Sequence, residues 1–534
     1  MIARTFSAEI EGITAKRIEI EVDINVGLHS FTIVGLADKA LSEAKERVNA
    51  ALKNSSMKPP NRENRKITVN LAPADIKKAG SQYDVAIALG YLLATKQMRE
   101  FRTDDKLFIG ELSLQGGIRP VRGCLNAVEM ATRNGFATVF LPADNAPEAE
   151  IARGISIIPV SSLAQLIRHL EGTEHVPPIV PVSHETLFAR AGAPPPVALS
   201  DIRGQHHAKR ALAVAAAGGH NILLFGPPGS GKSMLAQAMV SLLPPMTADE
   251  IAEVTKIYSA AGLTAGGVIA TRPFRAPHHT ASSVAIVGGG TVPRPGEVTL
   301  AHRGVLFLDE FPEFKHDVLE SLRQPMESGT ITVARINGTL TFPAQFTLLA
   351  AMNPCPCGFS TDPEKECVCS PYQVVKYRKR ISGPLTDRID LQIHVARIPT
   401  AELAVDHRIQ GATDSSAAAH GAVMRAIAIQ ADRFRGLPAA PVSGFGTLTT
   451  NGFSAGWRIT TSRNAEMTSR MCEERAAIRP DAKALLLSAV ERFKLSPRAY
   501  FRIIKTARTI ADLEEAAEIK TPHMAEAIGY RVRE

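Results

Sequence analysis

The chain lacks long apolar runs, and it contains only six cysteines among its 534 residues. No stretch approaches the roughly 18 consecutive apolar residues of a membrane-spanning helix, so we expect no membrane partner. The first residues lack the apolar core and cleavage site of a secretory signal peptide. So few cysteines in so long a chain do not form the disulfide framework of a secreted protein. Together these absences predict a cytoplasmic protein.

Apolar residues make up 45% of the chain, and its length allows roughly three domains, each with its own core. Alternating strand and helix patterns predict two α/β regions separated by a proline-rich linker and followed by a helical region. A segment rich in Gly, Thr and Ser interrupts the helical region and is predicted to be a flexible loop. The predicted boundaries are 1–170 and 199–398 for the α/β regions, 171–198 for the linker, 399–534 for the helical region and 437–461 for the loop.

The strongest motif is a glycine-rich sequence between a predicted strand and a predicted helix. It reads G-x-x-x-x-G-K-S and follows the apolar segment 222–225 directly. Glycines let backbone N–H groups turn toward phosphate oxygens at the N-terminus of a helix. Lys232 is predicted to reach the β- and γ-phosphates of ATP, and Ser233 is predicted to bind Mg²⁺. The predicted ATP-binding residues of this motif are Gly226, Pro227, Pro228, Gly229, Ser230, Gly231, Lys232 and Ser233.

Two further apolar strands are followed by polar residues. The segment 305–308 leads into Asp309 and Glu310, and the segment 346–351 is closely followed by Asn353. Asp309 is predicted to help hold Mg²⁺, Glu310 to polarise the attacking water, and Asn353 to orient it. The alternative for the two carboxylates is that they cap the following helix. Buried strands with polar residues at their carboxyl ends predict a parallel sheet with its ligand at that edge.

Longer blocks resemble the magnesium-chelatase-like AAA+ ATPases of the YifB/ComM family. The blocks are RPFRAPHHT, PRPGE, AHRGVLFLDEFPEF, AAMNPCPCG and SGPLTDRIDL. The similarity extends to NLAPADIKKAGSQYDVAIAL near the N-terminus and to LSPRAYFRIIKTARTIADL near the C-terminus, and it leaves out the predicted loop. The resemblance implies three parts: an N-terminal Lon-protease-like (ribosomal protein S5 domain 2-like) α/β domain, an AAA+ parallel-sheet core and a C-terminal helical lid.

The resemblance also implies roles that the residue pattern alone does not assign. Arg388 in LTDRID would be the arginine finger, which reaches the γ-phosphate bound by a neighbouring subunit. Arg498 in LSPRAY would be the sensor-2 arginine of the lid, and Ile202 and Gly204 would lie against the adenine. Because an arginine that acts on a neighbour requires a ring, the resemblance implies a homohexamer. For either arginine the alternative is a surface ion pair.

The implied Lon-like fold raises the question of protease activity, which the residues answer. Gln82 stands where a Lon-type enzyme has its serine nucleophile, and Leu125 stands near the position of the catalytic lysine. A serine hydroxyl without a base is not activated, so we predict that the neighbouring Ser81 is an ordinary loop residue. We therefore predict that the protein is not an active protease.

The net charge of +8 favours polyanionic partners, nucleic acid first. Two alternating segments around Asn337-Gly338 predict a β-hairpin. In the resembling proteins such a hairpin projects into a central pore, where Arg335 would contact DNA phosphates. The segment that follows Arg272, including Arg275, would be a second pore element. The pair His278–His279 in that segment could alternatively bind a metal ion.

Four of the six cysteines stand within fifteen positions. Cys355 and Cys357 form one Cys-x-Cys pair, Cys367 and Cys369 form another, and nine residues separate the two pairs. Two thiolate pairs joined by a turn suit a tetrahedral structural Zn²⁺ ion. Structural thiols without metal and a redox switch are the alternatives.

These features predict an ATPase that couples ATP hydrolysis to movement on DNA, single-stranded or branched, as a homohexamer. The resemblance narrows the role to helicase or branch-migration activity in homologous recombination during natural transformation. One alternative is an ATPase subunit of magnesium chelatase, which is not expected to carry the Lon-like N-terminal third. Another alternative is an AAA+ protein remodeller or transcriptional regulator.

Overall fold

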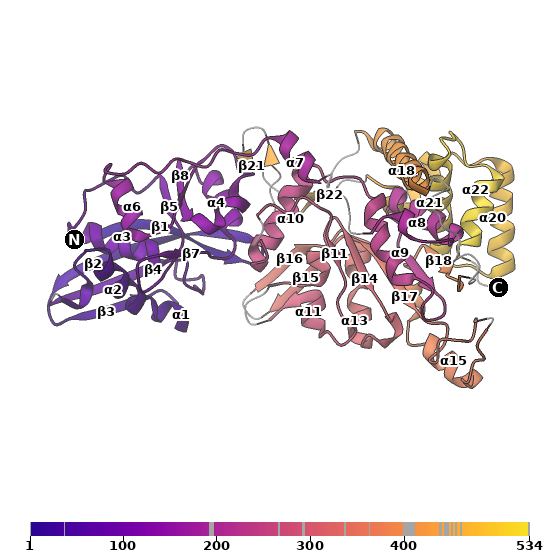
Figure 1. The fold of residues 1–534 in the computed structure, drawn as a ribbon, viewed down its shortest axis with the longest axis horizontal. Helices are drawn as coiled ribbons and strands as arrows, with labels where there is room; N and C mark the ends of the chain where they lie inside the picture. The colour runs from indigo at the N-terminus through magenta and orange to yellow at the C-terminus, as the bar shows by residue number, and fades with distance from the viewer. Residues whose placement is uncertain are drawn as a thin grey trace.

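The computed structural model arranges the chain in three parts along its long axis. The N-terminal α/β region lies at one end, a parallel sheet in the middle and the C-terminal helices at the other end (Figure 1). None of the helices in the described residues is both long and apolar enough to span a bilayer. The described residues are 2–36, 38–62, 64–191, 197–264, 267–290, 294–335, 338–362, 364–398, 412–436, 440–442, 448–449, 452–453, 457–459 and 462–531.

The N-terminal region contains a four-stranded sheet in the order β1-β2-β4-β3 and a parallel three-stranded sheet in the order β5-β8-β9. The predicted alternation in β2 is confirmed, because Ile18, Ile20 and Val22 are fully buried. Helix α3 packs against β1 and β2. The elements are β1 (Ile2–Glu11), β2 (Thr14–Val26), β3 (Ser30–Val34), α1 (Lys39–Ser42), α2 (Ala44–Asn54), β4 (Arg65–Ala72), α3 (Asp84–Ala94), β5 (Lys106–Phe108), β6 (Glu111–Leu112), β7 (Ile118–Arg119), α4 (Cys124–Arg133), β8 (Thr138–Pro142), α5 (Ala146–Ala149), β9 (Ser156–Val160) and α6 (Leu163–Leu170).

The segment predicted to be an aperiodic linker contains a helix, α7 (His184–Ala191). The Ser183 hydroxyl accepts a hydrogen bond from the Thr186 backbone N–H at 3.2 Å, and Leu187 is buried. Upstream of the helix, the Ile179 N–H donates to the Ile157 carbonyl at 2.8 Å. The segment is therefore packed against the N-terminal region. The short capped helix was not predicted, because the prolines around it are typical of a linker.

The central sheet has five parallel strands in the order β11-β14-β17-β10-β18. All five strands therefore end on the same side of the sheet, which we call the carboxyl edge, and all begin on the opposite side, which we call the amino edge. Neither term refers to the outermost strands. The three buried strands predicted from the sequence are confirmed as β10, β14 and β17. The elements are α8 (His206–Gly218), β10 (Ile222–Phe225), α9 (Lys232–Ala238), α10 (Ala248–Ala261), β11 (Phe274–Arg275), α11 (Ser283–Val287), β12 (Gly288–Gly289), β13 (Arg294–Pro295), α12 (Glu297–Leu300), β14 (Val305–Leu308), α13 (His316–Ser321), α14 (Arg323–Ser328), β17 (Thr347–Met352), α15 (Pro371–Arg378), α16 (Gly383–Thr386) and β18 (Leu391–His394).

The predicted β-hairpin is confirmed. Strands β15 (Thr330–Arg335) and β16 (Gly338–Pro343) pair antiparallel, with Arg335 opposite Gly338. Asn337 and the Arg335 side chain lie outside the described residues.

One face of this hairpin is buried, and it faces the N-terminal region. Ile331 and Phe342 are buried in a core that also includes Phe6 of β1. A Cβ atom on Gly12, in the turn between β1 and β2, would lie 3.2 Å from Cδ1 of Leu340. The hairpin therefore bridges the central region and the N-terminal region, as Figure 1 shows.

The C-terminal region is helical, as predicted. Helices α18 and α21 pack against α8 of the central region. Within the segment predicted to be a loop, the described residues form two short strand pairs, β19 with β22 and β20 with β21. The elements are α18 (Ala412–Phe434), β19 (Ala440–Val442), β20 (Leu448–Thr449), β21 (Gly452–Phe453), β22 (Trp457–Ile459), α19 (Ser469–Arg475), α20 (Pro480–Phe493), α21 (Pro497–Leu513) and α22 (Thr521–Gly529).

Candidate active site

The glycine-rich motif forms a loop between β10 and α9 at the carboxyl edge. Gly231 precedes the helix with a φ of +90°, a conformation that favours glycine. A Cβ on Gly226 would lie 2.1 Å from the Val395 carbonyl oxygen, so only glycine fits there. The loop therefore has the shape that the motif predicts.

Lys232 lies inside this loop. Its ammonium donates to the carbonyl oxygens of Gly226 at 2.9 Å and Pro227 at 2.8 Å. The Asn353 side-chain oxygen lies 3.4 Å away, because β17 places that residue beside the end of β10. Burial lowers the pKa of the Lys232 ammonium, and Asp309 opposes that shift. A buried cation inside this loop is complementary in charge to a phosphate ligand.

Asp309 and Ser233 meet at the same edge. The Ser233 hydroxyl donates to the Asp309 carboxylate at 3.1 Å, and both residues are exposed to solvent. A hydroxyl and a carboxylate are the oxygen ligands that Mg²⁺ prefers beside substrate phosphates. These two residues therefore fit the metal that the motif predicts.

Glu310 follows Asp309 in a left-handed backbone conformation, with a φ of +51°. Such a conformation in a non-glycine residue is uncommon and is found preferentially at functional sites. Its carboxylate lies 2.8 Å from Nδ1 of His279. No local sequence pattern links His279 to Glu310, because the two residues stand in separate segments and only the fold brings them together.

The residues predicted to face the adenine lie beside the phosphate loop. The Gln205 amide donates to the Ala396 carbonyl at 2.7 Å and contacts the Ser230 carbonyl at 3.4 Å. Ile202 is buried, and Gly204 has a φ of +55°. The structure thus brings the segment that contains Ile202 and Gly204 next to the predicted phosphate site.

Arg388 lies at the amino edge, just before β18. Its Nη2 atom pairs with the Glu327 carboxylate at 2.5 Å, and its Nη1 atom donates to the Pro384 carbonyl at 2.7 Å. Its side chain is 8% exposed, and its Nε atom has no hydrogen-bond partner within the described part of the chain. A buried guanidinium with one unsatisfied donor is poised for a further acceptor.

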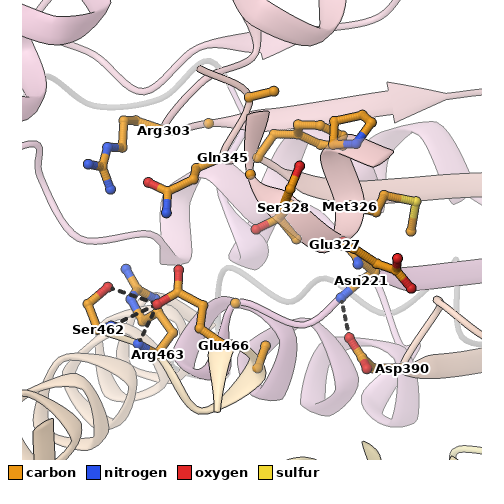
Figure 2. Close-up of a pocket in the computed structure, with 18 of the residues that line it drawn as sticks. Asn221, Arg303, Met326, Glu327, Ser328, Gln345, Asp390, Ser462, Arg463 and Glu466 are labelled. Carbon is orange, nitrogen blue, oxygen red and sulfur yellow. Dashed lines mark hydrogen bonds between the residues drawn. The ribbon is translucent and has the colours of Figure 1, made fainter. Parts of the chain in front are cut away.

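A cleft of about 460 Å³ opens at this edge. Figure 2 shows Glu327 and Asp390 on one side of the cleft and Arg463 and Glu466 on the other. The β15–β16 hairpin starts and ends at its rim, because residues 325–329 and 344–347 line the cleft. Glu327 therefore lies between the hairpin and Arg388.

Asp390 anchors α21 to the amino edge. The Arg502 guanidinium pairs with the Asp390 carboxylate and donates to the Arg388 carbonyl at 3.0 Å. Burial acts to raise the pKa of Asp390, but Arg502 and His220 outweigh it and hold that pKa below its usual range. Arg498 is one turn before Arg502 on the same helix, and its side chain is exposed.

The two edges are separated by the length of the strands, about 13 Å for four residues. Arg388 therefore lies across the sheet from the phosphate loop of its own subunit. Arg498, on a helix anchored at the amino edge, lies on the same side as Arg388.

Arg272 and Arg275, predicted to contact DNA, both have partners within the protein. The predicted pore insert begins inside the central sheet, since Arg275 belongs to β11 and pairs there with β14. Its guanidinium makes two hydrogen bonds to Glu297, at 2.6 and 2.8 Å. Arg272 is 9% exposed and donates to Glu250 and to backbone carbonyls. Both arginines are engaged within the protein, and their contact with DNA stays a prediction.

The four clustered cysteines converge. Their Sγ atoms all lie within 4.8 Å of one another, and none is in a disulfide. They are carried by the loop between β17 and α15, directly after Asn353. The structure therefore confirms that the two Cys-x-Cys pairs face each other.

Three family profiles match the chain in order. They are described as "Subunit ChlI of Mg-chelatase" over 20–145, "Magnesium chelatase, subunit ChlI" over 198–403 and "Magnesium chelatase, subunit ChlI C-terminal" over 413–531. The Competence protein ComM of Haemophilus influenzae is 39% identical, over 99% of this chain and 97% of its own length. The chain belongs to the magnesium-chelatase-like family that includes ComM. The protein YifB of Salmonella typhimurium is 37% identical over 97% of this chain and 95% of its own length.

The magnesium-chelatase-like family implies an AAA+ ATPase that uses ATP and Mg²⁺. The 38 kDa magnesium-chelatase subunit of Rhodobacter capsulatus is also similar, but only in part. It is 29% identical over 29% of this chain and 49% of its own length. One family named for the chelatase subunit matches the N-terminal residues 20–145.

Proposed function

We propose that the protein is a homohexameric AAA+ ATPase that couples ATP hydrolysis to movement on DNA. The proposed role is helicase or branch-migration activity in homologous recombination during natural transformation, in the cytoplasm. The observation that carries the proposal is the division of the predicted catalytic residues between the two edges of one sheet. The similarity to a competence protein over almost the whole chain supports the biological setting.

At the carboxyl edge, the residues fit ATP and Mg²⁺. When bound, these ligands supply the phosphoryl group and the cation that neutralises its charge. The loop 226–233 would hold the phosphates, with Lys232 exchanging backbone carbonyls for phosphate oxygens. Ser233 and Asp309 would hold Mg²⁺. Glu310 would accept a proton from the attacking water, and Asn353 would keep that water oriented.

At the amino edge, Arg388 and Arg498 would complete the site of a neighbouring subunit. Placing the amino edge of one subunit against the carboxyl edge of the next is a head-to-tail contact, which closes into a ring when the rotation allows it. The six-fold number comes from the family resemblance. The guanidinium of Arg388 would neutralise charge in the transition state, an effect of about 10³ to 10⁵ in rate in other nucleotide hydrolases.

The proposed DNA contact is the β15–β16 hairpin, with Arg335 near its tip. The net charge of +8 supports an anionic partner. The hairpin is rooted at the cleft that holds Glu327, and Glu327 holds Arg388. A displacement of the hairpin by DNA would therefore move Glu327, and with it Arg388, which would act on the next subunit. We also propose a Zn²⁺ ion as a ligand of the four cysteines, because their sulfur atoms converge.

The test is the steady-state ATPase rate without DNA, with single-stranded DNA and with forked DNA. We expect stimulation by DNA, with a loss of stimulation but not of basal activity in Arg335→Ala. Phosphate contacts set the salt dependence of binding, so this variant is also expected to bind DNA with a salt slope lower by about one. An active ATPase that no DNA stimulates would favour a chelatase-type subunit or a protein remodeller instead.

A further inference from the structure

We propose that Cys355, Cys357, Cys367 and Cys369 hold one structural Zn²⁺ ion, and that this ion braces the phosphate-binding loop and Asn353. The consequence for ATP rests on the function proposed above, whereas the metal site itself does not. The zinc would take no part in the reaction. It would fix the segment that connects β17 to α15.

The spacing of the sulfur atoms fits a metal and not a disulfide. The Sγ atom of Cys355 lies 3.4 Å from that of Cys357 and 3.7 Å from that of Cys367. The Cys357 and Cys367 sulfurs are 3.6 Å apart. A disulfide bond is about 2.05 Å long. Sulfurs bound to tetrahedral zinc at about 2.3 Å are separated by about 3.8 Å, which is close to the spacings in the structure.

The fourth thiol faces the same point. The Cys369 sulfur accepts a hydrogen bond from the Cys357 backbone N–H at 3.4 Å. Backbone N–H groups that donate to ligand sulfurs are outer-shell contacts, of the kind that orient metal ligands. Four thiols from two short pairs would repel one another once ionised, and a divalent cation offsets that repulsion. Zinc therefore explains why the chain folds these groups together.

The cysteine loop rests directly on the phosphate-binding loop. Gly358 lies within it with a φ of +88°, and a Cβ there would lie 2.6 Å from Cδ of Pro228. Pro228 belongs to the phosphate-binding motif, and its ring cannot move aside as a flexible side chain can. The same Cβ would lie 3.9 Å from the Asn353 side chain. One glycine of the cysteine loop thus contacts both the phosphate loop and the predicted water-orienting residue.

Helix α15 fastens the other end of the loop. The buried Tyr377 hydroxyl hydrogen-bonds the Asn353 backbone, and the Arg378 guanidinium donates to the Pro354 carbonyl at 3.2 Å. In Figure 1 this helix extends away from the body of the central region. A metal between this helix and β17 would therefore help to set where Asn353 and Pro228 lie.

The first measurement is the metal content of the full-length protein purified without chelator. We expect about one zinc per chain, and none in the double variant Cys355→Ser/Cys357→Ser. The control variant Cys472→Ala removes a buried cysteine outside the cluster and is expected to keep the metal. Co²⁺ added to the demetallated wild-type protein should give the absorption of a tetrahedral thiolate site. Wild-type protein that contains no zinc and gives no such Co²⁺ spectrum would overturn the metal site.

The second measurement tests the brace. Gly358→Ala keeps all four thiols but pushes the cysteine loop away from Pro228. We expect this variant to retain zinc and to show an ATPase rate at least about tenfold lower, since displacements near 1 Å can reduce rates by up to 10²-fold. Removal of zinc by the double cysteine variant should lower the ATPase rate similarly and also lower the melting temperature. Normal ATPase activity in a zinc-free, folded variant would overturn the brace.

The two proposals fail in different ways. Wild-type protein that contains zinc but hydrolyses no ATP would contradict the proposed function and leave the metal site standing. For that case, binding of a fluorescent ATP analogue replaces the ATPase rate. Weaker binding in Gly358→Ala than in wild type would still support the brace, and equal binding would overturn it.

Discussion

The two edges of the central sheet differ in how they are built. At the carboxyl edge, Asp309 and Asn353 follow directly after β14 and β17, and Lys232 begins the helix after the loop that follows β10, so neighbouring strands bring them together. At the amino edge, Arg388 precedes a strand, and its partner Glu327 comes from a helix that leads into the hairpin. An edge assembled from strand ends can be predicted from local sequence. An edge assembled from separate segments requires the fold.

The two edges also share a feature. At each one, a predicted catalytic side chain is held by a residue in, or next to, a segment that was expected to contact DNA: His279 lies in the predicted second pore element, and Glu327 lies on the helix that precedes the hairpin. His279 holds Glu310 at the carboxyl edge, and Glu327 holds Arg388 at the amino edge. Both contacts are ion pairs or charged hydrogen bonds that are partly open to solvent. Because each carboxylate is about half exposed, each contact is open to exchange with a new partner.

Removing the arginine at the amino edge should have the largest effect. Arg388→Ala is expected to lower the ATPase rate by about 10³-fold or more while ATP binding is retained, because the charge it supplies is needed only in the transition state. Arg425→Ala, which removes an exposed arginine paired with Glu515, is the control and should keep wild-type activity. An Arg388→Ala protein with normal turnover would show that Arg388 is a structural ion pair.

The corresponding change at the carboxyl edge is Glu310→Gln. It should lower the ATPase rate by about 10²-fold, because the amide cannot accept the proton of the attacking water. Ser233 and Asp309 are unchanged, so binding of ATP with Mg²⁺ should persist. The nearby exposed Glu313, changed to Gln, serves as the control. Turnover near the wild-type rate in Glu310→Gln would assign the base to another residue.

Releasing Arg388 should have a smaller effect in the opposite direction. Glu327→Gln removes the charge that holds Arg388. The Glu327 carboxylate is half exposed, and a pair open to solvent on one side is worth about 1 kcal/mol. We expect the ATPase rate without DNA to rise by about fivefold and the further stimulation by DNA to shrink. Glu320→Gln, on the preceding helix α13, is the control. A fall to the level of Arg388→Ala would mean that Glu327 positions the arginine instead of restraining it.

The smallest effect is expected for His279→Ala at the carboxyl edge. Loss of the contact with Glu310 should raise the ATPase rate without DNA by about twofold and reduce its response to DNA. His278→Ala is a matched control for the neighbouring ring, because His278 is exposed, hydrogen-bonds Thr280 and packs its ring against His279. If both histidine variants respond to DNA as wild type does, the contact between His279 and Glu310 has no regulatory role.

The sequence was most informative where one short segment carries the whole pattern. The phosphate loop, the buried strands β10, β14 and β17 and the hairpin turn at Asn337-Gly338 depend on local residue order, and the structure shows the strands and the hairpin as predicted. The strand that contains Arg275 was not predicted, because a two-residue strand is too short to show an alternating pattern. Glu327 and His279 were missed because no local pattern marks a residue whose partner stands far along the chain.

The most direct test of the division between the two edges is a mixture of Glu310→Gln and Arg388→Ala subunits, each inactive by itself. In a ring where Arg388 serves the neighbouring subunit, some interfaces combine an intact phosphate site with an intact arginine. Equal mixing should then restore roughly a quarter of the wild-type ATPase rate, since two independent halves must coincide at each interface. A mixture as inactive as the separate variants would place both residues in the same site and contradict the proposed ring.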